Sequence, residues 1–208
     1  MMKKIVFLFL FGLILSSCQA PQEYIKYISK KENIEVPKTK NVVIIASDNV
    51  ILNEFTKTYK KNYEDDTDFT RAYLYQLTKE MKQRNIFAEV RMDSKTLNYE
   101  RLDTNTADYV IQLSNFEINN RVEWRNSAMG VNGMQTSTSV EFCVMSIKVA
   151  IYDAKTNKEI LDFIVFGEES VFLFDFTKTL EKAKSESILH IINYLETGKI
   201  AYKQQLFN

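Results

Sequence analysis

Residues 140–166 read VEFCVMSIKVAIYDAKTNKEILDFIVF, and this stretch decides the fold. Apolar residues occupy both parities over 140–152, and a second apolar segment follows at 160–166. Between them, Asp153-Ala154-Lys155-Thr156-Asn157 has the polar composition of a turn. The pattern predicts an antiparallel β-hairpin.

A long β-like segment, 107–124, precedes the hairpin. Apolar residues occupy odd-numbered positions only at the start of this segment, whereas they occupy even-numbered positions through to its end. The first set is Tyr109, Ile111 and Leu113, and the second is Val110, Phe116, Ile118, Val122 and Trp124. We expect a strand that is buried on both faces at first and half exposed later.

A strand, helix and second strand are predicted nearer the N-terminus. Residues 42–46 form an apolar run, and residues 87–92 alternate as a strand does. Between them, Phe69, Tyr73, Leu77 and Met81 are four residues apart, which predicts a helix near 68–85 that connects the two strands. Residues 50–63 can form either a short helix or an extension.

Three aspartates, Asp65, Asp66 and Asp68, lie at the start of that helix. Carboxylates favour the positive end of a helix dipole, so capping is a simpler interpretation than metal ligation. We therefore predict neither a metal site nor a cofactor.

The last predicted element is a helix over 176–197. Its apolar stripe is Phe176, Leu180, Ala183, Ser187, Ile188, Ile191 and Leu195, and Gly198 ends it. The order of elements predicts an α+β two-layer sandwich, a mostly antiparallel sheet of four to five strands with two helices on one face. The other face is expected to stay partly available.

The composition bounds the function. The 208 residues contain 27 basic and 27 acidic side chains, and 45% are hydrophobic, which is typical of a globular chain. Nucleic-acid binding relies on clustered Lys and Arg, and the chain has no such block. We therefore expect no nucleic-acid partner.

The N-terminus is typical of a secretory signal. Lys3 and Lys4 precede an apolar run at 5–15, which is shorter than the roughly 20 residues that cross a bilayer. Leu15-Ser16-Ser17-Cys18 then resembles the bacterial lipoprotein signal. The resemblance implies diacylglycerol on the Cys18 sulfur and cleavage before Cys18. The alternative is an ordinary signal peptide with a chance cysteine.

The predicted organisation has three parts: a signal peptide at 1–17, a lipidated Cys18 with a tether over 18–40, and a single α+β domain at 41–208. Both prolines lie in the tether segment, which lacks sustained periodicity. Gln19 stands where Asp would be the retention signal of enterobacterial inner-membrane lipoproteins. We therefore expect an anchor in the outer membrane, with the protein facing the periplasm.

No catalytic motif is present, and we predict that the chain is not an enzyme. After lipidation of Cys18, Cys143 is the only other cysteine, and it lies in an apolar run where a buried, inert thiol is expected. For the single histidine, His190, packing or a helix-surface role is expected rather than metal ligation or acid–base chemistry. The alternative function is an envelope hydrolase with an unrecognised active site.

The predicted partner-binding surface lies at the end of the long strand and in the loop at 126–138. Its residues are Arg121, Trp124, Arg125, Met129 and Met134. Trp and Arg are enriched at binding hot spots, and methionines between Gly130 and Gly133 offer adaptable contacts. The alternative is that Trp124 closes the edge of the core.

The segment at 107–117, the hairpin at 151–161 and the last helix together resemble the core of small envelope lipoproteins. The nearest in pattern are the auxiliary lipoproteins of ABC-type lipid transporters, and lipopolysaccharide-assembly lipoproteins are similar in shape. The resemblance covers about 42–196 and implies a non-catalytic subunit of a transport or assembly complex. Residues 55–63 and 126–138 depart from the pattern, and no functional residue is carried over.

Overall fold

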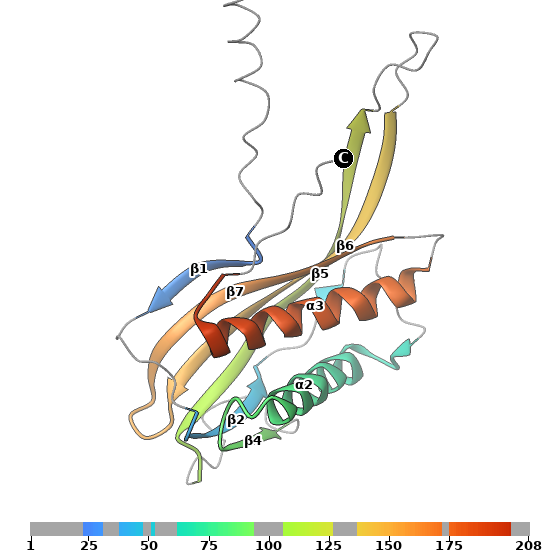
Figure 1. Cartoon of the computed structure of the whole chain (residues 1–208). Helices are drawn as coiled ribbons and strands as arrows, with labels where there is room; N and C mark the ends of the chain where they lie inside the picture. The colour runs from blue at the N-terminus through green and yellow to red at the C-terminus, as the bar shows by residue number, and fades with distance from the viewer. Residues whose placement is uncertain are drawn as a thin grey trace, which may run out of the picture.

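The computed structural model describes residues 23–30, 38–47, 51–52, 62–93, 106–126, 137–171 and 175–200 (Figure 1). Its elements, in chain order, are β1 (Ile25–Lys30), β2 (Asn41–Ala46), β3 (Ile51–Leu52), α2 (Asp66–Gln83), β4 (Glu89–Asp93), β5 (Tyr109–Asn126), β6 (Ser137–Asp153), β7 (Lys158–Ser170) and α3 (Phe176–Thr197). The predicted signal peptide at 1–17 and Cys18 lie outside the described residues.

One mixed sheet forms the centre of the molecule, with strand order β1-β7-β6-β5-β2-β4 and β3 beside β5. The predicted hairpin is present as β6 and β7, which pair antiparallel from Asp153↔Lys158 to Phe142↔Ser170. Strands β5–β6 and β1–β7 are also antiparallel, whereas β2 pairs in parallel with β4 and β5. The predicted α+β sandwich is confirmed, and the sheet has more strands than the four to five expected.

The strand, helix and strand predicted near the N-terminus are β2, α2 and β4. Parallel pairing of β2 with β4 confirms the helical crossover. Asp65 caps α2, because its side chain accepts a 2.7 Å hydrogen bond from the Asp68 backbone N–H. The capping interpretation of the aspartates is thus supported. Among the described residues, no group of three or more His, Cys, Asp or Glu side chains could hold a metal ion.

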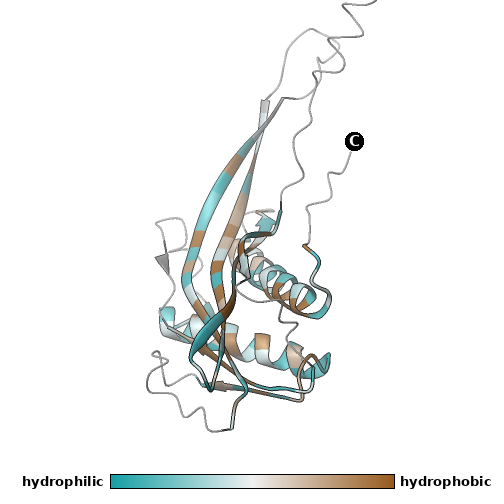
Figure 2. Ribbon diagram, turned by 90° about the vertical axis from the view of Figure 1, so that its left-hand side faces the viewer, coloured by the Kyte–Doolittle hydropathy of each residue, from teal (hydrophilic) through white to brown (hydrophobic). Residues whose placement is uncertain are grey.

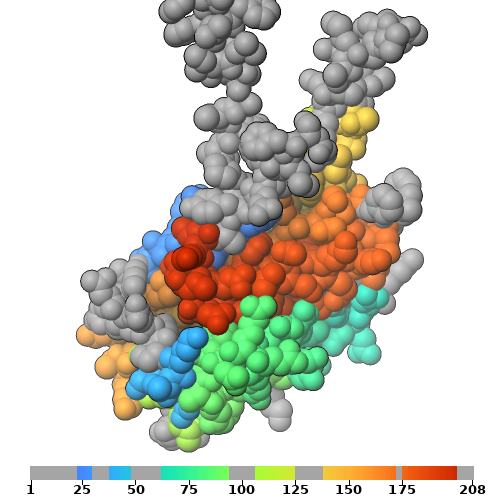
Figure 3. All heavy atoms as spheres, viewed as in Figure 1, coloured from blue at the N-terminus to red at the C-terminus, as the bar shows by residue number. Residues whose placement is uncertain are grey.

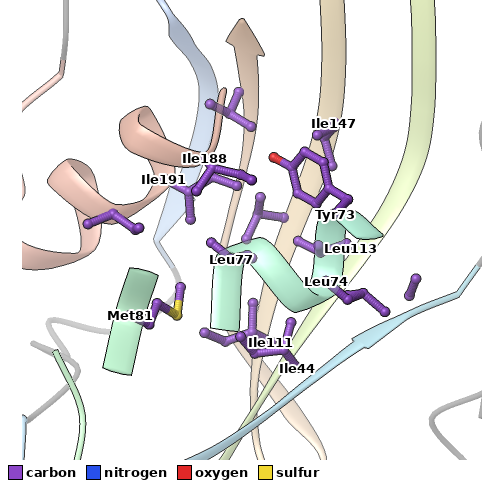
Figure 4. Packing of buried hydrophobic residues seen from close by; sticks show 14 of the residues in the cluster. Ile44, Tyr73, Leu74, Leu77, Met81, Ile111, Leu113, Ile147, Ile188 and Ile191 are labelled. Carbon is purple, nitrogen blue, oxygen red and sulfur yellow. The ribbon is translucent and has the colours of Figure 1, made fainter. Parts of the chain in front are cut away.

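Both helices cover the same face of the sheet, and the main core lies between the two layers (Figures 3 and 4). Tyr73, Leu77 and Met81 of α2 are fully buried there, as are Ile191 of α3 and Ile147 of β6. Tyr73 also joins the helices, because its hydroxyl lies 2.9 Å from Ser187 Oγ. The apolar stripes therefore bury against a shared partner, as predicted.

The opposite face of the sheet is only partly covered. A small cluster of Val43, Ile45, Ala107 and Val110 is buried on it. Farther along, Lys148 and Asp162 are half-buried and form a 3.3 Å ion pair. The partial exposure of Lys148 and Asp162 agrees with the expectation that this face of the sheet stays partly available.

A β-bulge explains why the core-facing residues of β5 change from odd-numbered to even-numbered positions. The register with β6 shifts between Ser114 and Glu117, and Asn115 has φ 50°. Leu113 before the bulge and Phe116 after it therefore face the same core. The start of the strand is buried on both faces, as predicted, because Tyr109 and Ile111 on one face and Val110 on the other are all buried.

The tether prediction for 18–40 needs correction, because Ile25–Lys30 forms a strand of the sheet. Ile25 is fully buried and pairs with Val165 of β7. The strand is irregular, with Tyr27 at φ 54° and a register shift between Lys26 and Ser29. Irregular pairing with a distant strand leaves no sequence periodicity, which is why the sequence did not indicate it.

Candidate partner-binding arm

Strands β5 and β6 continue beyond the rest of the sheet as a two-stranded ribbon (Figures 1 and 2). Strand β7 ends opposite Phe142 of β6, and β2 ends opposite Leu113 of β5. Beyond those ends, residues 122–126 of β5 and 137–141 of β6 pair with each other up to Asn126↔Ser137. Of the described residues outside the two strands, Val171 still reaches their base, where its backbone N–H donates a 2.7 Å hydrogen bond to the Glu141 carbonyl oxygen. We call these two segments the arm.

The arm displays two apolar side chains. Trp124 is 72% exposed and Val122 is 46% exposed. They have the same parity as Ile118, which is fully buried in the core beneath the helices. The arm thus continues the core-facing side of β5 beyond the region that the helices cover, and the alternative in which Trp124 closes the core is wrong.

Arg121 lies at the base of the arm and is held within the chain. Its guanidinium makes a 2.7 Å ion pair with the buried Glu168 and a 2.9 Å ion pair with Glu123. Its Cζ also lies 4.9 Å from the centre of the Phe142 ring. These contacts tie β5 to β6 and β7, so Arg121 braces the arm, whereas Trp124 is displayed to solvent.

Of the other predicted partner-binding residues, only Arg125 lies within the described residues. Arg125 belongs to β5 and pairs with Thr138 of β6. Met129 and Met134 lie outside the described residues. The structure therefore brings Arg121, Trp124 and Arg125 onto one strand end.

His190 and Cys143, the two residues considered for chemistry, are both buried. His190 Nδ1 lies 2.8 Å from the Phe166 carbonyl oxygen, and its ring stacks on Tyr24 at 4.3 Å between centroids. Burial lowers the pKa of His190, against the opposing effects of the Phe166 carbonyl and Glu186. The packing role expected for His190 is confirmed.

Tyr24 is fixed to the sheet edge by this histidine. Its backbone carbonyl accepts a 2.7 Å hydrogen bond from the Phe166 N–H. Burial and the charges of Glu168 and Glu186 raise the pKa of the Tyr24 phenol to about 12, so it stays protonated at neutral pH. The chain is therefore already attached to the body at Tyr24.

An open groove lies between α2 and the edge strand β4, and no sequence pattern considered above predicts it. It encloses about 540 Å³ and is lined by Tyr75, Thr78, Lys79, Lys82, Gln83, Arg91 and Met92. Its lining holds three cations and no carboxylate. Tyr75, Lys79 and Lys82 share one exposed side of α2, and this spacing is the signal that could have indicated the groove.

None of the helices in the described part of the chain is long and apolar enough to cross a membrane.

No protein-family model matches the chain, and no curated protein matches it. The fold is similar to several solved structures. PelC from Paraburkholderia phytofirmans, solved as a dodecamer, is 12% identical, with 84% of this chain and 98% of that chain covered and a TM-score of 0.45. A neuraminyllactose-binding hemagglutinin homolog from Helicobacter pylori is 12% identical, with 82% and 90% covered and a TM-score of 0.49.

A minor lipoprotein from Acinetobacter baumannii is also similar, at 9% identity, with 78% and 98% covered and a TM-score of 0.39. Bacterial lipoproteins are thus among the structures that this chain resembles. At such identities and TM-scores, the likeness concerns the fold alone.

Proposed function

We propose that this chain is a non-catalytic accessory protein of a bacterial cell-envelope complex, anchored in a membrane through a lipidated Cys18. Its role is in lipid transport or envelope assembly, at the outer membrane and facing the periplasm. The partner is another protein of the complex, and the arm is the part of this chain that reaches it.

The exposure of Trp124 on the projecting arm is the observation that carries the proposal. A large aromatic side chain loses favourable burial when it is left 72% exposed. Trp is also the residue type most enriched at binding hot spots. An exposed Trp on an extended ribbon therefore favours a contact outside the chain.

The proposal includes the absence of catalysis, and the burial of two potentially reactive side chains supports this part of it. Cys143 is fully buried, and His190 is 6% exposed with Nδ1 directed to a backbone carbonyl. A nucleophile and base need access to a substrate and to each other. Neither side chain is open in this way.

Affinity purification from native membranes tests the proposal. The full chain, with a C-terminal tag, is extracted in mild detergent beside the Trp124→Ala and Tyr75→Ala variants. Tyr75 is a matched control, because it is 61% exposed but lies on α2, away from the arm. Stoichiometric recovery of a transporter or barrel protein is expected, and Trp124→Ala should weaken that recovery while Tyr75→Ala leaves it unchanged.

Solitary recovery with hydrolytic activity would contradict the proposal and favour the envelope hydrolase. Equal partner recovery by all three chains would show that the arm is not the contact. Purified chain lacking acyl groups at Cys18, measured by mass spectrometry, would show that the anchor is wrong.

A further inference from the structure

The arm and the start of β1 lie at the same end of the sheet. Strand β7 runs toward the arm, since its Lys158 end pairs with Asp153 and its Ser170 end pairs with Phe142. Strand β1 is antiparallel to β7, so β1 begins at the arm end and leads away from it (Figure 1). The segment that precedes β1 therefore enters the body from the arm side.

The distance from Cys18 to the body has an upper limit. Tyr24 is attached to Phe166 and His190 and is the sixth residue after Cys18. A fully extended chain spans at most about 3.6 Å per residue, so Cys18 lies within about 22 Å of Tyr24. A membrane that holds acyl chains on Cys18 must lie within a similar distance of Tyr24.

The arm projects a similar distance from the same row of the sheet. Tyr24 bonds to Phe166, which pairs with Ser146, and Ser146 pairs with Glu117 of β5. These residues form one row across the sheet. Trp124 is seven residues beyond Glu117, and at about 3.3 Å per residue it projects about 23 Å past this row.

We propose that Val122 and Trp124 lie at the surface of the same bilayer that holds Cys18, with the Trp124 ring among the lipid headgroups. This inference rests on the anchor in the proposed function and names what the arm touches. When the arm end faces the membrane, the segment between Cys18 and Tyr24 is too short to hold the bilayer clear of the arm, because its upper limit of about 22 Å does not exceed the arm's projection of about 23 Å.

The chemistry of the Trp124 side of the arm fits a lipid interface. Trp is enriched at the membrane–water boundary, where its apolar ring and polar N–H are both satisfied. The strand opposite carries Ser139 across from Trp124 and Glu141 across from Val122, so the arm is too polar to insert deeply.

Lipid on the Trp124 side leaves the other side of the arm for the protein partner. Glu123 has the opposite parity in β5 and is braced by Arg121 at the arm's base.

The single tryptophan makes the test specific, because all indole emission comes from Trp124. The lipidated full chain is reconstituted into vesicles of phosphatidylethanolamine and phosphatidylglycerol, with and without phospholipids brominated on the acyl chains near the headgroup. We expect a blue shift of the emission on reconstitution and a loss of emission with brominated lipid. The control is the double variant Trp124→Phe, Tyr75→Trp, whose reporter lies on α2 at the β4 edge and should show neither effect.

Three outcomes overturn the inference. In the first, the Trp124 emission stays red-shifted and is quenched by iodide in the water. In the second, the emission is blue-shifted but brominated lipid does not quench it. In the third, brominated lipid quenches both reporters equally. The second outcome would mean that a protein surface covers Trp124. Flotation of the vesicles tests the lipid anchor separately from the position of Trp124. A chain that floats but shows no quenching refutes only this inference, whereas a chain that fails to float refutes the anchor.

Discussion

Replacing Gly167 by alanine should destabilise the fold strongly, because the added methyl group would collide with the backbone of α3. Gly167 lies in β7 and faces the backbone of α3. A Cβ atom at this position would lie 2.1 Å from the Ala183 carbonyl oxygen and 2.6 Å from the Ser187 backbone nitrogen. Both atoms belong to the α3 backbone, so no side-chain rotation can relieve the contact.

The magnitude follows from how far α3 must move. Ordinary contacts of a carbon atom lie near 3.5 Å, so relief of the clash requires a shift of more than about 1 Å. Such a shift loosens the packing of Leu180, Ile188 and Ile191, all of which are buried against the sheet. Overpacking costs about 1–3 kcal/mol, and we expect about 3 kcal/mol because backbone atoms are involved. For a chain of this length that corresponds to about 6–12 °C in the melting temperature.

Thermal and urea denaturation of the chain without residues 1–18, followed by circular dichroism, measures this loss. Gly198→Ala is the matched control, because its φ is 66° and no atom lies within 4 Å of an added Cβ. Its cost should come only from the left-handed backbone, about 1 kcal/mol. A loss for Gly167→Ala no larger than that of Gly198→Ala would refute the close approach of α3 to β7.

Three further predictions concern the anchor, the arm and the buried histidine. Cys18→Ala should move the full chain from the detergent phase to the aqueous phase in Triton X-114 partition; retention in the detergent phase would contradict a lipid anchor. Trp124→Ala should change the free energy of unfolding by less than about 0.5 kcal/mol, since the side chain is 72% exposed, and a loss of several kcal/mol in urea denaturation would place it in the core. Burial lowers the pKa of His190 in the folded state, so the stability that the neutral imidazole contributes is present above the unfolded value of about 6.5 and is lost as the pH falls through the folded value. His190→Asn retains a donor for the Phe166 carbonyl and should therefore flatten the decline in stability between about pH 7 and pH 5, and an unchanged slope would assign that decline to other groups.

The sequence determined the elements whose signals are local. The polar residues at 153–157 between two apolar runs specify the β6–β7 hairpin, and the four-residue spacing from Phe69 to Met81 specifies α2. Asp65 and Gly198 mark helix ends because capping depends on atoms within one turn. Each of these predictions requires only neighbours in the chain.

Tertiary structure decided what depends on distant segments. Strand β1 exists because Ile25 fits beside Val165, a pairing that leaves no period in its own sequence. The parity of β5 predicted that Val122 and Trp124 share a face with Ile118, but the same parity is compatible with a buried or an exposed Trp124. Ile118 is buried and Trp124 is exposed because the helices cover one part of that face and end before the other. Burial is a property of what packs against a residue, and for the arm that depends on where α2 and α3 stop.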